Sequence, residues 1–474
     1  MAARVPLVRK TQAGIAAGSR EAISADYLAD ETAILGKIIP IARLDAGETR
    51  QVERIARRLV EGVRAGRHRT GGIDAMLHEY DLSSEEGVVL MCLAEALLRI
   101  PDIETRDELI REKIGSADWK SHLGHSDSLF VNASTWGLLL TGRVVRFDLE
   151  KSGGVDGFLK RLVARSGEGA IRKAVTHAVR IIGRQFVLGE TIGEALEAAE
   201  RGEAAAYRYS FDMLGEAAKT AEDAAGYLQS YLEATKAVGA RNQASSVFAA
   251  QSISVKLSAL HPRYEYVKRE RILSELVPNL ITLASAAKSF GIGLTIDAEE
   301  ADRLDLSLDI FEKLAAAPEL AGWNGLGLAV QAYQKRALSV LDFLADLASQ
   351  TGRRLPVRLV KGAYWDTEIK RAQIAGLPGY PVFTRKVSTD TNYLACARTL
   401  LSRRDRFFPQ FATHNAHTVA AVQVFAGDNS DYEFQRLHGM GGALYEQIVE
   451  GQGKLPLRVY APVGSHEHLL AYLV

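Results

Sequence analysis

The chain of 474 residues has only two cysteines, Cys92 and Cys396. Two thiols do not make a disulfide framework, and they match no zinc-binding spacing, which indicates a reducing compartment. The sequence also lacks net charge, because 58 basic residues balance 58 acidic ones. A dedicated nucleic-acid-binding protein is expected to carry an excess of positive charge. We therefore expect a small-molecule partner and no nucleic acid.

Long apolar runs and glycine-rich nucleotide-binding fingerprints are also missing. The most apolar windows, 87–98 and 138–145, are short or interrupted by charged residues, so no membrane-spanning helix is expected. The N-terminus has no apolar run of the kind found in secretory signals, which favours a cytoplasmic protein. The segment 325–328 lacks the third glycine of a dinucleotide-binding motif, and no P-loop occurs. These absences disfavour a Rossmann domain but leave room for a cofactor bound across the mouth of a barrel.

The first two hundred residues have the patterning of helices. In 45–66 the apolar residues Val52, Ile55, Leu59 and Val63 have the spacing of one buried helical face. Further helical patterns cover 83–100, 153–186 and 191–201. We expect an N-terminal helical arm over 1–112 and a helical domain over 113–203. The arm is expected either to mediate self-association into a homo-oligomer or to fold back on the rest of its own chain.

After about residue 204 short segments rich in β-formers alternate with long helical patterns. The expected strands are 206–213, 252–257, 293–297, 325–331, 356–361, 409–413, 433–438 and 456–460. The expected helices between them are 221–238, 270–290, 304–317, 337–352, 387–402 and 418–426. Eight strand–helix repeats predict an α/β fold, a distorted (βα)8 TIM-like barrel over 204–474 that follows an all-α arm and helical domain.

The active site of such a barrel lies at the carboxyl ends of its strands. Nearly every expected strand here ends in an ionisable or hydrogen-bonding side chain, which a set of random surface loops would rarely provide. These residues are Asp212, Lys256, Asp297, Glu299, Gln331, Tyr333, Lys361, Tyr364, His414, Asn415, His438 and Tyr460. The pattern predicts an enzyme.

Three kinds of site fit these residues. Lys256 suits the Schiff-base lysine of an aldolase-type enzyme if apolar surroundings lower its pKa. With Arg358 and Lys361 it suits instead a positive cluster that holds an anionic substrate and an electron-rich cofactor. The third alternative is a metal site, for which the candidate ligands are Asp297, Glu299, His414 and His417. A barrel that binds a ligand without catalysis is the non-enzymatic alternative.

Nine sequence segments, in the same order along the chain, carry a resemblance to a known family. They are 128–142 (SLFVNASTWGLLLTG), 209–216 (YSFDMLGE), 253–264 (ISVKLSALHPRY), 296–303 (IDAEEADR), 330–336 (VQAYQKR), 357–365 (VRLVKGAYW), 411–417 (FATHNAH), 434–441 (FQRLHGMG) and 459–467 (VYAPVGSHE). The sequence resembles the proline dehydrogenase part of the proline utilization A (PutA) flavoenzymes over nearly its whole length.

The resemblance implies an FAD-dependent oxidation of L-proline to Δ1-pyrroline-5-carboxylate, the first step of proline catabolism. It implies hydride transfer from proline C5 to flavin N5, after which electrons pass to a quinone through peripheral contact with the inner face of the membrane. Lys256, Arg358 and Asp297 take the catalytic positions of the family. Lys256 also pairs with the proline carboxylate, and the remaining substrate positions are Ala363, Tyr364, Leu437, Tyr460 and Tyr472.

The resemblance also assigns residues to the cofactor. Arg358 corresponds to an arginine beside flavin N5 and O4, where a cation favours negative charge on the reduced flavin. Gln331 corresponds to a residue on the pyrimidine edge. The full set of cofactor positions is Val330, Gln331, Arg358, Lys361, Gly362, Ala363, Trp365, Thr384, Lys386, Thr413, His414, Asn415, Gln435 and Leu437.

The sequence departs from the family pattern in three places. In the family the last barrel helix continues into two adjacent arginines that bind the proline carboxylate, and this sequence ends at Val474, just before them. The first 25 residues lack the basic arm of a ribbon-helix-helix segment. The aldehyde dehydrogenase half of PutA is missing from this chain. We expect weaker proline binding, no transcriptional repression and only the first of the two oxidations.

Overall fold

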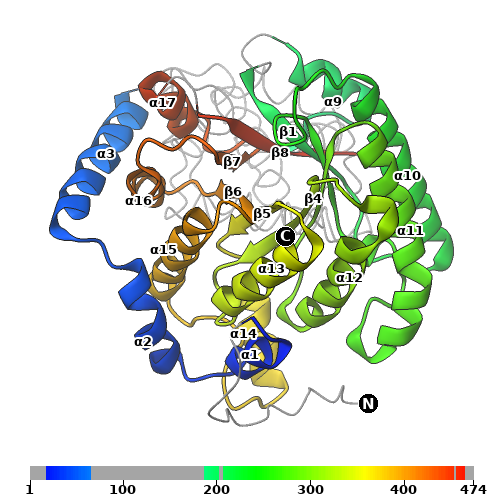
Figure 1. Cartoon of the computed structure of the whole chain (residues 1–474), viewed down its shortest axis with the longest axis horizontal. Helices are drawn as coiled ribbons and strands as arrows, with labels where there is room; N and C mark the ends of the chain where they lie inside the picture. The colour runs from blue at the N-terminus through cyan, green and yellow to red at the C-terminus, as the bar shows by residue number, and fades with distance from the viewer. Residues whose placement is uncertain (1–17, 66–185, 202–205, 453–454, 465–474) are drawn as a thin grey trace, which may run out of the picture.

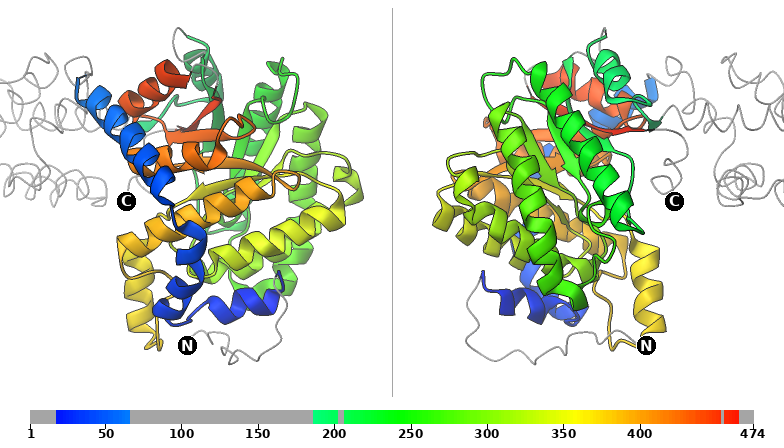
Figure 2. Two further views of the ribbon diagram at one scale, coloured as in Figure 1. Left: turned by 60° about the vertical axis from the view of Figure 1, so that its left-hand side comes forward. Right: turned by 90° about the vertical axis from the view of Figure 1, so that its right-hand side faces the viewer.

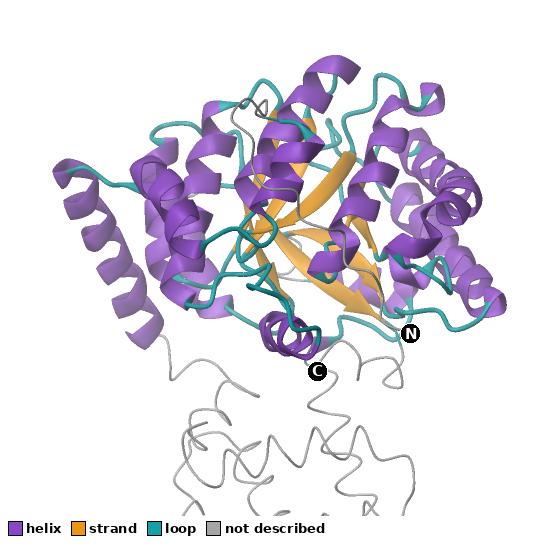
Figure 3. Ribbon diagram, turned by 90° about the horizontal axis from the view of Figure 1, so that it is seen from below, coloured by secondary structure: helices purple, strands orange, loops and turns teal. Residues whose placement is uncertain are grey.

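The computed structural model describes residues 18–65, 186–201, 206–452 and 455–464. Eight parallel strands close into a barrel in chain order, with β8 paired to β1, and helices surround them (Figure 3). The strands are β1 (Arg208–Met213), β2 (Ser252–Val255), β3 (Gly293–Ile296), β4 (Leu326–Gln331), β5 (Leu355–Val360), β6 (Phe407–Ala412), β7 (Glu433–Leu437) and β8 (Leu457–Val463). All eight expected strands are present, which confirms the (βα)8 barrel.

Most of the helices around the barrel bury an apolar face, and some of them also carry a cap. The helices are α10 (Ala221–Ala240), α11 (Arg269–Ser289), α12 (Leu304–Ala316), α13 (Ala337–Thr351), α14 (Trp365–Ile374), α15 (Lys386–Ser402), α16 (Ala416–Ala426) and α17 (Gly442–Gln452), preceded by α9 (Ile192–Ala199). Thr220 begins α10 with a reciprocal capping box, and Gly352 ends α13 in the left-handed region. Helices α14 and α17 were not predicted, and α14 buries only Glu368 and Ala372.

The interior of the barrel is polar. Parallel strands covered on both faces usually consist of nearly continuous apolar residues. Here every second residue is apolar and fully buried against the helices, such as Phe211, Ile253 and Val459. Many of the alternate, inward-facing residues are polar and also buried, among them Ser210, Asp212, Ser252, Ser254, Arg358, Gln410, Glu433, Gln435 and Arg458. The lumen is therefore lined by charges and hydrogen-bonding groups that must satisfy one another.

The N-terminal helices α1 (Arg20–Asp26), α2 (Glu31–Ala42) and α3 (Ala46–Ala65) run along the outside of the barrel. Figures 1 and 2 show these blue helices beside α13, α15, α16 and α17. Ile34 and Ile38 of α2 pack with Phe383 and with Ala395 of α15. The described part of the arm thus folds back on its own barrel, the second of the two alternatives considered for it.

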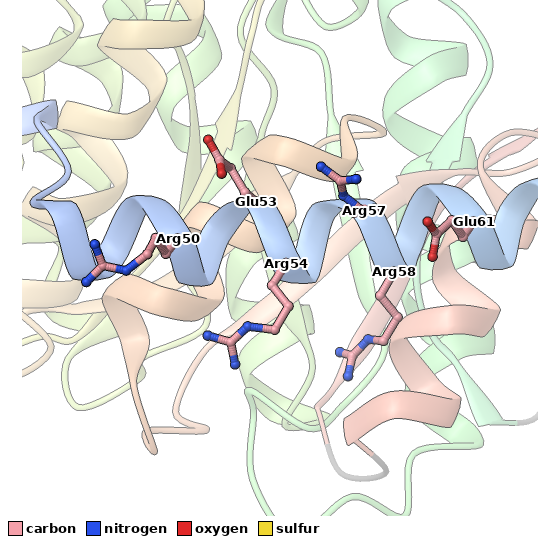
Figure 4. A pocket seen from close by; sticks show the side chains of 6 residues that line it. All are labelled: Arg50, Glu53, Arg54, Arg57, Arg58 and Glu61. Atoms are coloured by element: carbon pink, nitrogen blue, oxygen red, sulfur yellow. The ribbon is translucent and has the colours of Figure 1, made fainter.

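Helix α3 confirms the helix expected over 45–66. Its residue Val52 is fully buried against Ala420 and Ala421 of α16. Its outer face is charged and exposed, as Figure 4 shows for Arg50, Glu53, Arg54, Arg57, Arg58 and Glu61. The helices expected over 83–100 and 153–186 and the segment 128–142 lie outside the described residues. No helix in the described part of the chain is long and apolar enough to cross a membrane.

Candidate active site

A buried ion pair joins the ends of the first two strands. Lys256 follows β2 directly, and its Nζ lies 2.6 Å from Oδ2 of Asp212 on β1. Asp212 is fully buried. Burial alone would lower the pKa of Lys256, but the carboxylates of Asp212 and Asp297 outweigh it and hold this pKa well above its usual value. A permanently charged lysine does not suit a Schiff-base enzyme, so the structure disfavours the aldolase alternative.

Tyr460 on β8 connects this pair to the third strand. Its hydroxyl accepts a hydrogen bond from Lys256 Nζ at 3.3 Å and donates one to Asp297 Oδ2 at 2.7 Å. Asp297 follows β3 and is 8% exposed. Residues from opposite parts of the sequence therefore share one hydrogen-bonded cluster at the carboxyl end of the barrel.

Arg358 of β5 extends the cluster to the other side of the lumen. Three acceptors hold its guanidinium: Asp297 Oδ1 at 2.6 Å from Nη1, Gln435 Oε1 at 2.7 Å from Nε, and Ser210 Oγ at 2.8 Å from Nη2. The guanidinium carbon lies 5.1 Å from the ring centroid of Tyr460. Only 3% of Arg358 is exposed, so its orientation is fixed by these partners. The structure thus brings Lys256, Asp297, Arg358 and Tyr460 together, as the sequence predicted.

Lys361 forms an ion pair with a residue outside this cluster. Its Nζ lies 2.5 Å from Oδ1 of Asp390 on α15. Burial lowers the pKa of Lys361, and Asp390 opposes that effect. Lys386 reaches the other oxygen of the same carboxylate at 2.6 Å. Lys361 therefore forms its ion pair on the α15 side of the mouth, and its place in the expected positive cluster with Lys256 and Arg358 stays a prediction.

The segment that follows Lys361 turns sharply. Gly362 has φ +139°, and a Cβ on it would clash with the ring of Tyr333. Ala363 is exposed, and Trp365 is 41% exposed although its Nε1 donates to Phe383 O at 2.8 Å. Burial raises the pKa of the half-buried Tyr364. An exposed indole beside a glycine turn leaves a flat apolar surface at the mouth.

Gln331 at the end of β4 contacts the neighbouring loop. Its Nε2 donates to the backbone oxygens of Ala298 and Glu299 at 3.3 and 3.2 Å, and its Oε1 accepts from Gln334. Val330 beside it is 4% exposed. The amide is therefore oriented by the loop after β3.

The arm reaches the expected cofactor site through Thr384. Both the backbone N–H and the hydroxyl of Thr384 donate to Oε2 of Glu31, at 3.0 and 2.9 Å. Glu31 begins α2, more than three hundred residues away in the sequence. No local signal in the sequence pointed to this contact.

The ends of β6 and β7 are also joined. His414 Nε2 accepts the backbone N–H of Leu437 at 3.1 Å, which requires an unprotonated ring nitrogen. Desolvation and then the charge of Arg436 lower the pKa of His414 to about 4, in agreement with this role. Asn415 caps α16, and its backbone N–H donates to the hydroxyl of Thr413. These residues mainly organise the loops of the mouth.

The metal alternative is not supported. Within the described ranges no group of three or more histidine, cysteine or acidic residues is placed to hold a metal ion. Asp297 is bound by Arg358, and Glu299 forms an ion pair with Arg303 at 2.6 Å. Tyr472, expected at the substrate, lies outside the described residues.

Several buried polar residues of the lumen escaped the sequence prediction. Ser210, Gln410, Glu433 and Arg458 lie deeper than the strand ends on which that prediction relied. A signal was available, because polar residues alternate with apolar ones in 208–212, 252–256, 433–435 and 458–460. In strands of a closed barrel, period-two alternation places those polar residues inside.

The sequence matches three known protein families in succession. Residues 18–64 match the proline utilization A proline dehydrogenase N-terminal domain, and residues 195–474 match proline dehydrogenase. Residues 72–186, of which all but the last lie outside the described ranges, match a family described as the DNA-binding domain of proline dehydrogenase. The expectation that the chain has no nucleic-acid partner is therefore not confirmed.

Individual proteins give a consistent result. The chain is 53% identical over 466 residues to the bifunctional protein PutA of Salmonella typhimurium, covering 96% of this chain and 35% of that protein. It is 27% identical over 292 residues to the proline dehydrogenase of Deinococcus radiodurans, covering 60% and 82% of the two chains. A crystal structure of a bifunctional PutA is 48% identical with a TM-score of 0.71, covering 94% and 44%. The chain spans about a third of the length of the curated PutA relatives.

Proposed function

The chain belongs to the proline dehydrogenase family, and from that membership we propose that it oxidises L-proline to Δ1-pyrroline-5-carboxylate with FAD as its cofactor. The observation that carries the proposal is the buried cluster of Lys256, Tyr460, Asp297 and Arg358. This cluster places two cations at the mouth of the barrel, Lys256 balanced by Asp212 and Arg358 balanced by Asp297. A zwitterionic amino acid and an electron-rich ring system need such an arrangement.

The chemistry of the donor set fits a flavin. Gln331, Arg358 and Gln435 come from β4, β5 and β7, so polar groups line the part of the mouth around β5. Farther out, Lys361 and Lys386 provide positive charge suited to phosphates. When bound, FAD supplies the hydride acceptor, taking a hydride from C5 of proline at its N5 atom.

The chain's own residues would then bind and orient the substrate. Lys256 stays protonated beside Asp212 and offers its charge to the proline carboxylate. Tyr364 follows β5 and Leu437 ends β7, and both would border the apolar ring with Ala363 and Tyr460. Fixing the substrate against the cofactor turns an encounter of two molecules into a step within one complex.

Arg358 contributes a charge that is already in place. Because Asp297, Gln435 and Ser210 hold all its nitrogens, its guanidinium does not need to reorganise as negative charge develops on the cofactor. We propose that electrons leave the reduced cofactor to a quinone at the membrane face, as the family resemblance implies.

The test uses the purified protein supplied with FAD. Bound flavin gives a yellow protein, and L-proline added without oxygen should bleach the flavin absorption and support reduction of a dye. Arg358→Met or Lys256→Met should lower proline-dependent reduction by several orders of magnitude, or sharply raise the proline concentration required.

A matched control is available in Arg353, a second buried arginine. It donates only to the backbone oxygens of Ala315, Leu320 and Trp323 among the described residues. Arg353→Met should reduce stability without altering flavin reduction at a temperature where the variant is folded. Unchanged kinetics in both Arg358→Met and Lys256→Met, or a protein that binds no flavin, would refute the proposal.

A further inference from the structure

The floor of the barrel holds a carboxylate that the proposed chemistry does not touch. Glu433 on β7 has no exposed surface. Five N–H groups point at its two oxygens: Nε and Nη2 of Arg458, Nη1 of Arg208, Nε2 of Gln410 and Nε2 of Gln435. The distances range from 2.7 Å for Arg458 Nε to 3.3 Å for Arg208. Only an ionised carboxylate, which accepts and does not donate, satisfies all five.

One of these donors leads directly to the proposed site. Glu433 and Gln435 are two residues apart on one strand, so both face the lumen. Gln435 Nε2 donates to Glu433 Oε1 at 2.8 Å, and Gln435 Oε1 accepts from Arg358 Nε at 2.7 Å. The amide of Gln435 is thereby oriented at both ends.

The orientation matters because the two ends of a glutamine amide are chemically opposite. A rotation by half a turn would place the NH2 group against Arg358 Nε, which is also a donor. The ionised Glu433 excludes that rotation, because a carbonyl oxygen facing a carboxylate has no proton to share. Gln435 itself is 1% exposed, so water does not compete for either end.

We propose that Glu433 is a positioning residue for the oxidation: it holds the Gln435 carbonyl toward Arg358 and so fixes the guanidinium against the cofactor. The inference rests on the proposed function and extends it to a residue at the opposite end of the lumen. Glu433 acts through Gln435 and not by touching substrate or cofactor.

A double-mutant cycle tests this route. Three variants are compared with the wild type: Glu433→Gln alone, Gln435→Met alone, which removes the amide, and the double variant. The midpoint potential of bound FAD is measured with kcat and KM for proline. Glu433→Gln should lower kcat about tenfold with little change in KM. It should also shift the midpoint potential about 30 mV more negative, which for a two-electron couple corresponds to a tenfold change in the equilibrium constant.

The decisive result is the interaction between the two substitutions. If Glu433 acts through Gln435, Glu433→Gln should have no further effect in the Gln435→Met background. An equal effect in both backgrounds would show that Glu433 acts through its charge or through stability, and would overturn the inference. No effect of Glu433→Gln in the wild-type background would overturn it as well.

Gln410→Met provides the structural control. Gln410 donates to the same Glu433 oxygen at 2.8 Å but comes from β6. This variant should lose stability and keep the potential of the wild type. If Glu433→Gln does not fold, Glu433→Gln combined with Arg458→Met removes both charges of the pair and enters the same cycle.

A crystal structure of the Glu433→Gln variant gives a readout that does not depend on activity. We expect the contact between Arg358 Nε and Gln435 Oε1 to be lost, and retention of that contact would overturn the inference. Wild-type protein that binds no flavin, or whose flavin proline does not reduce, would refute the proposed function and this inference with it. A reducible flavin with an additive cycle would refute the inference alone.

Discussion

Replacing Lys256 by methionine separates the structural role of this residue from its proposed role in binding. The substitution leaves the fully buried carboxylate of Asp212 without its partner at 2.6 Å. Removing one member of a buried ion pair typically costs about 3–5 kcal/mol, because the remaining charge is uncompensated. We expect Lys256→Met to lower the free energy of unfolding by about that amount at neutral pH.

The loss of stability in Lys256→Met should depend on pH, because the unpaired carboxylate of Asp212 becomes neutral when it takes up a proton. Burial already raises the pKa of Asp212 above the ordinary value of an aspartate, and the charge of Lys256 is the main influence that opposes the rise. Without Lys256 the pKa of Asp212 rises further. The unfolded carboxyl is charged above about pH 4, so the stability of the variant should fall as pH increases through the raised pKa of the folded state.

Urea unfolding between pH 4 and pH 8 measures this slope. The double variant Lys256→Met, Asp212→Leu removes both charges and should recover most of the lost stability, since an apolar replacement of a buried pair is often neutral. Proline-dependent flavin reduction should stay low in both variants. A single variant as stable as the wild type at every pH, or a double variant less stable than the single one, would refute this reasoning.

Three further predictions follow from other parts of the structure. Desolvation and the charge of Arg436 lower the pKa of His438 from 6.5 to about 4. The free energy of unfolding of the wild type should therefore fall as pH drops across that interval, by at most about 3 kcal/mol. Urea unfolding of His438→Asn should show a weaker dependence of this free energy on pH. Gly362→Ala adds a Cβ at φ +139° against a neighbouring ring, so it should reduce flavin content and cost about 1–3 kcal/mol, measured by absorption and thermal unfolding. Arg20→Ala removes the partly buried ion pair in which Arg20 Nη2 lies 2.9 Å from Asp309 Oδ1, and it should lower the free energy of unfolding by about 1 kcal/mol. The loss should be seen as faster proteolysis of the arm, and proteolysis at the wild-type rate would contradict the prediction.

Much of the barrel could be predicted because its local signals agree with the final fold. Segments such as 206–213 and 356–361 are short and rich in β-formers, and most helices between the strands have an apolar face. Helix α14 gave no such signal, because it packs only Glu368 and Ala372 against the protein.

The site could be predicted in part, since the strand ends of a parallel barrel must meet at one edge. That rule was enough to bring Lys256, Asp297 and Tyr460 together. The rule does not specify which side chains bond to one another. The ion pair of Lys361 with Asp390 and the hydrogen bonds of Thr384 with Glu31 were therefore not predicted. Such contacts depend on packing between segments hundreds of residues apart.

The position of the arm has a consequence for how the chain is made. Helices α2 and α3 are translated early, but the surfaces that cover Ile34 and Val52 belong to α15 and α16, near the other end of the sequence. At roughly 5–20 residues per second, the ribosome needs on the order of tens of seconds to supply them. During that interval the apolar stripes of the nascent helices stay uncovered, and a holdase that shields them would raise the yield of native protein.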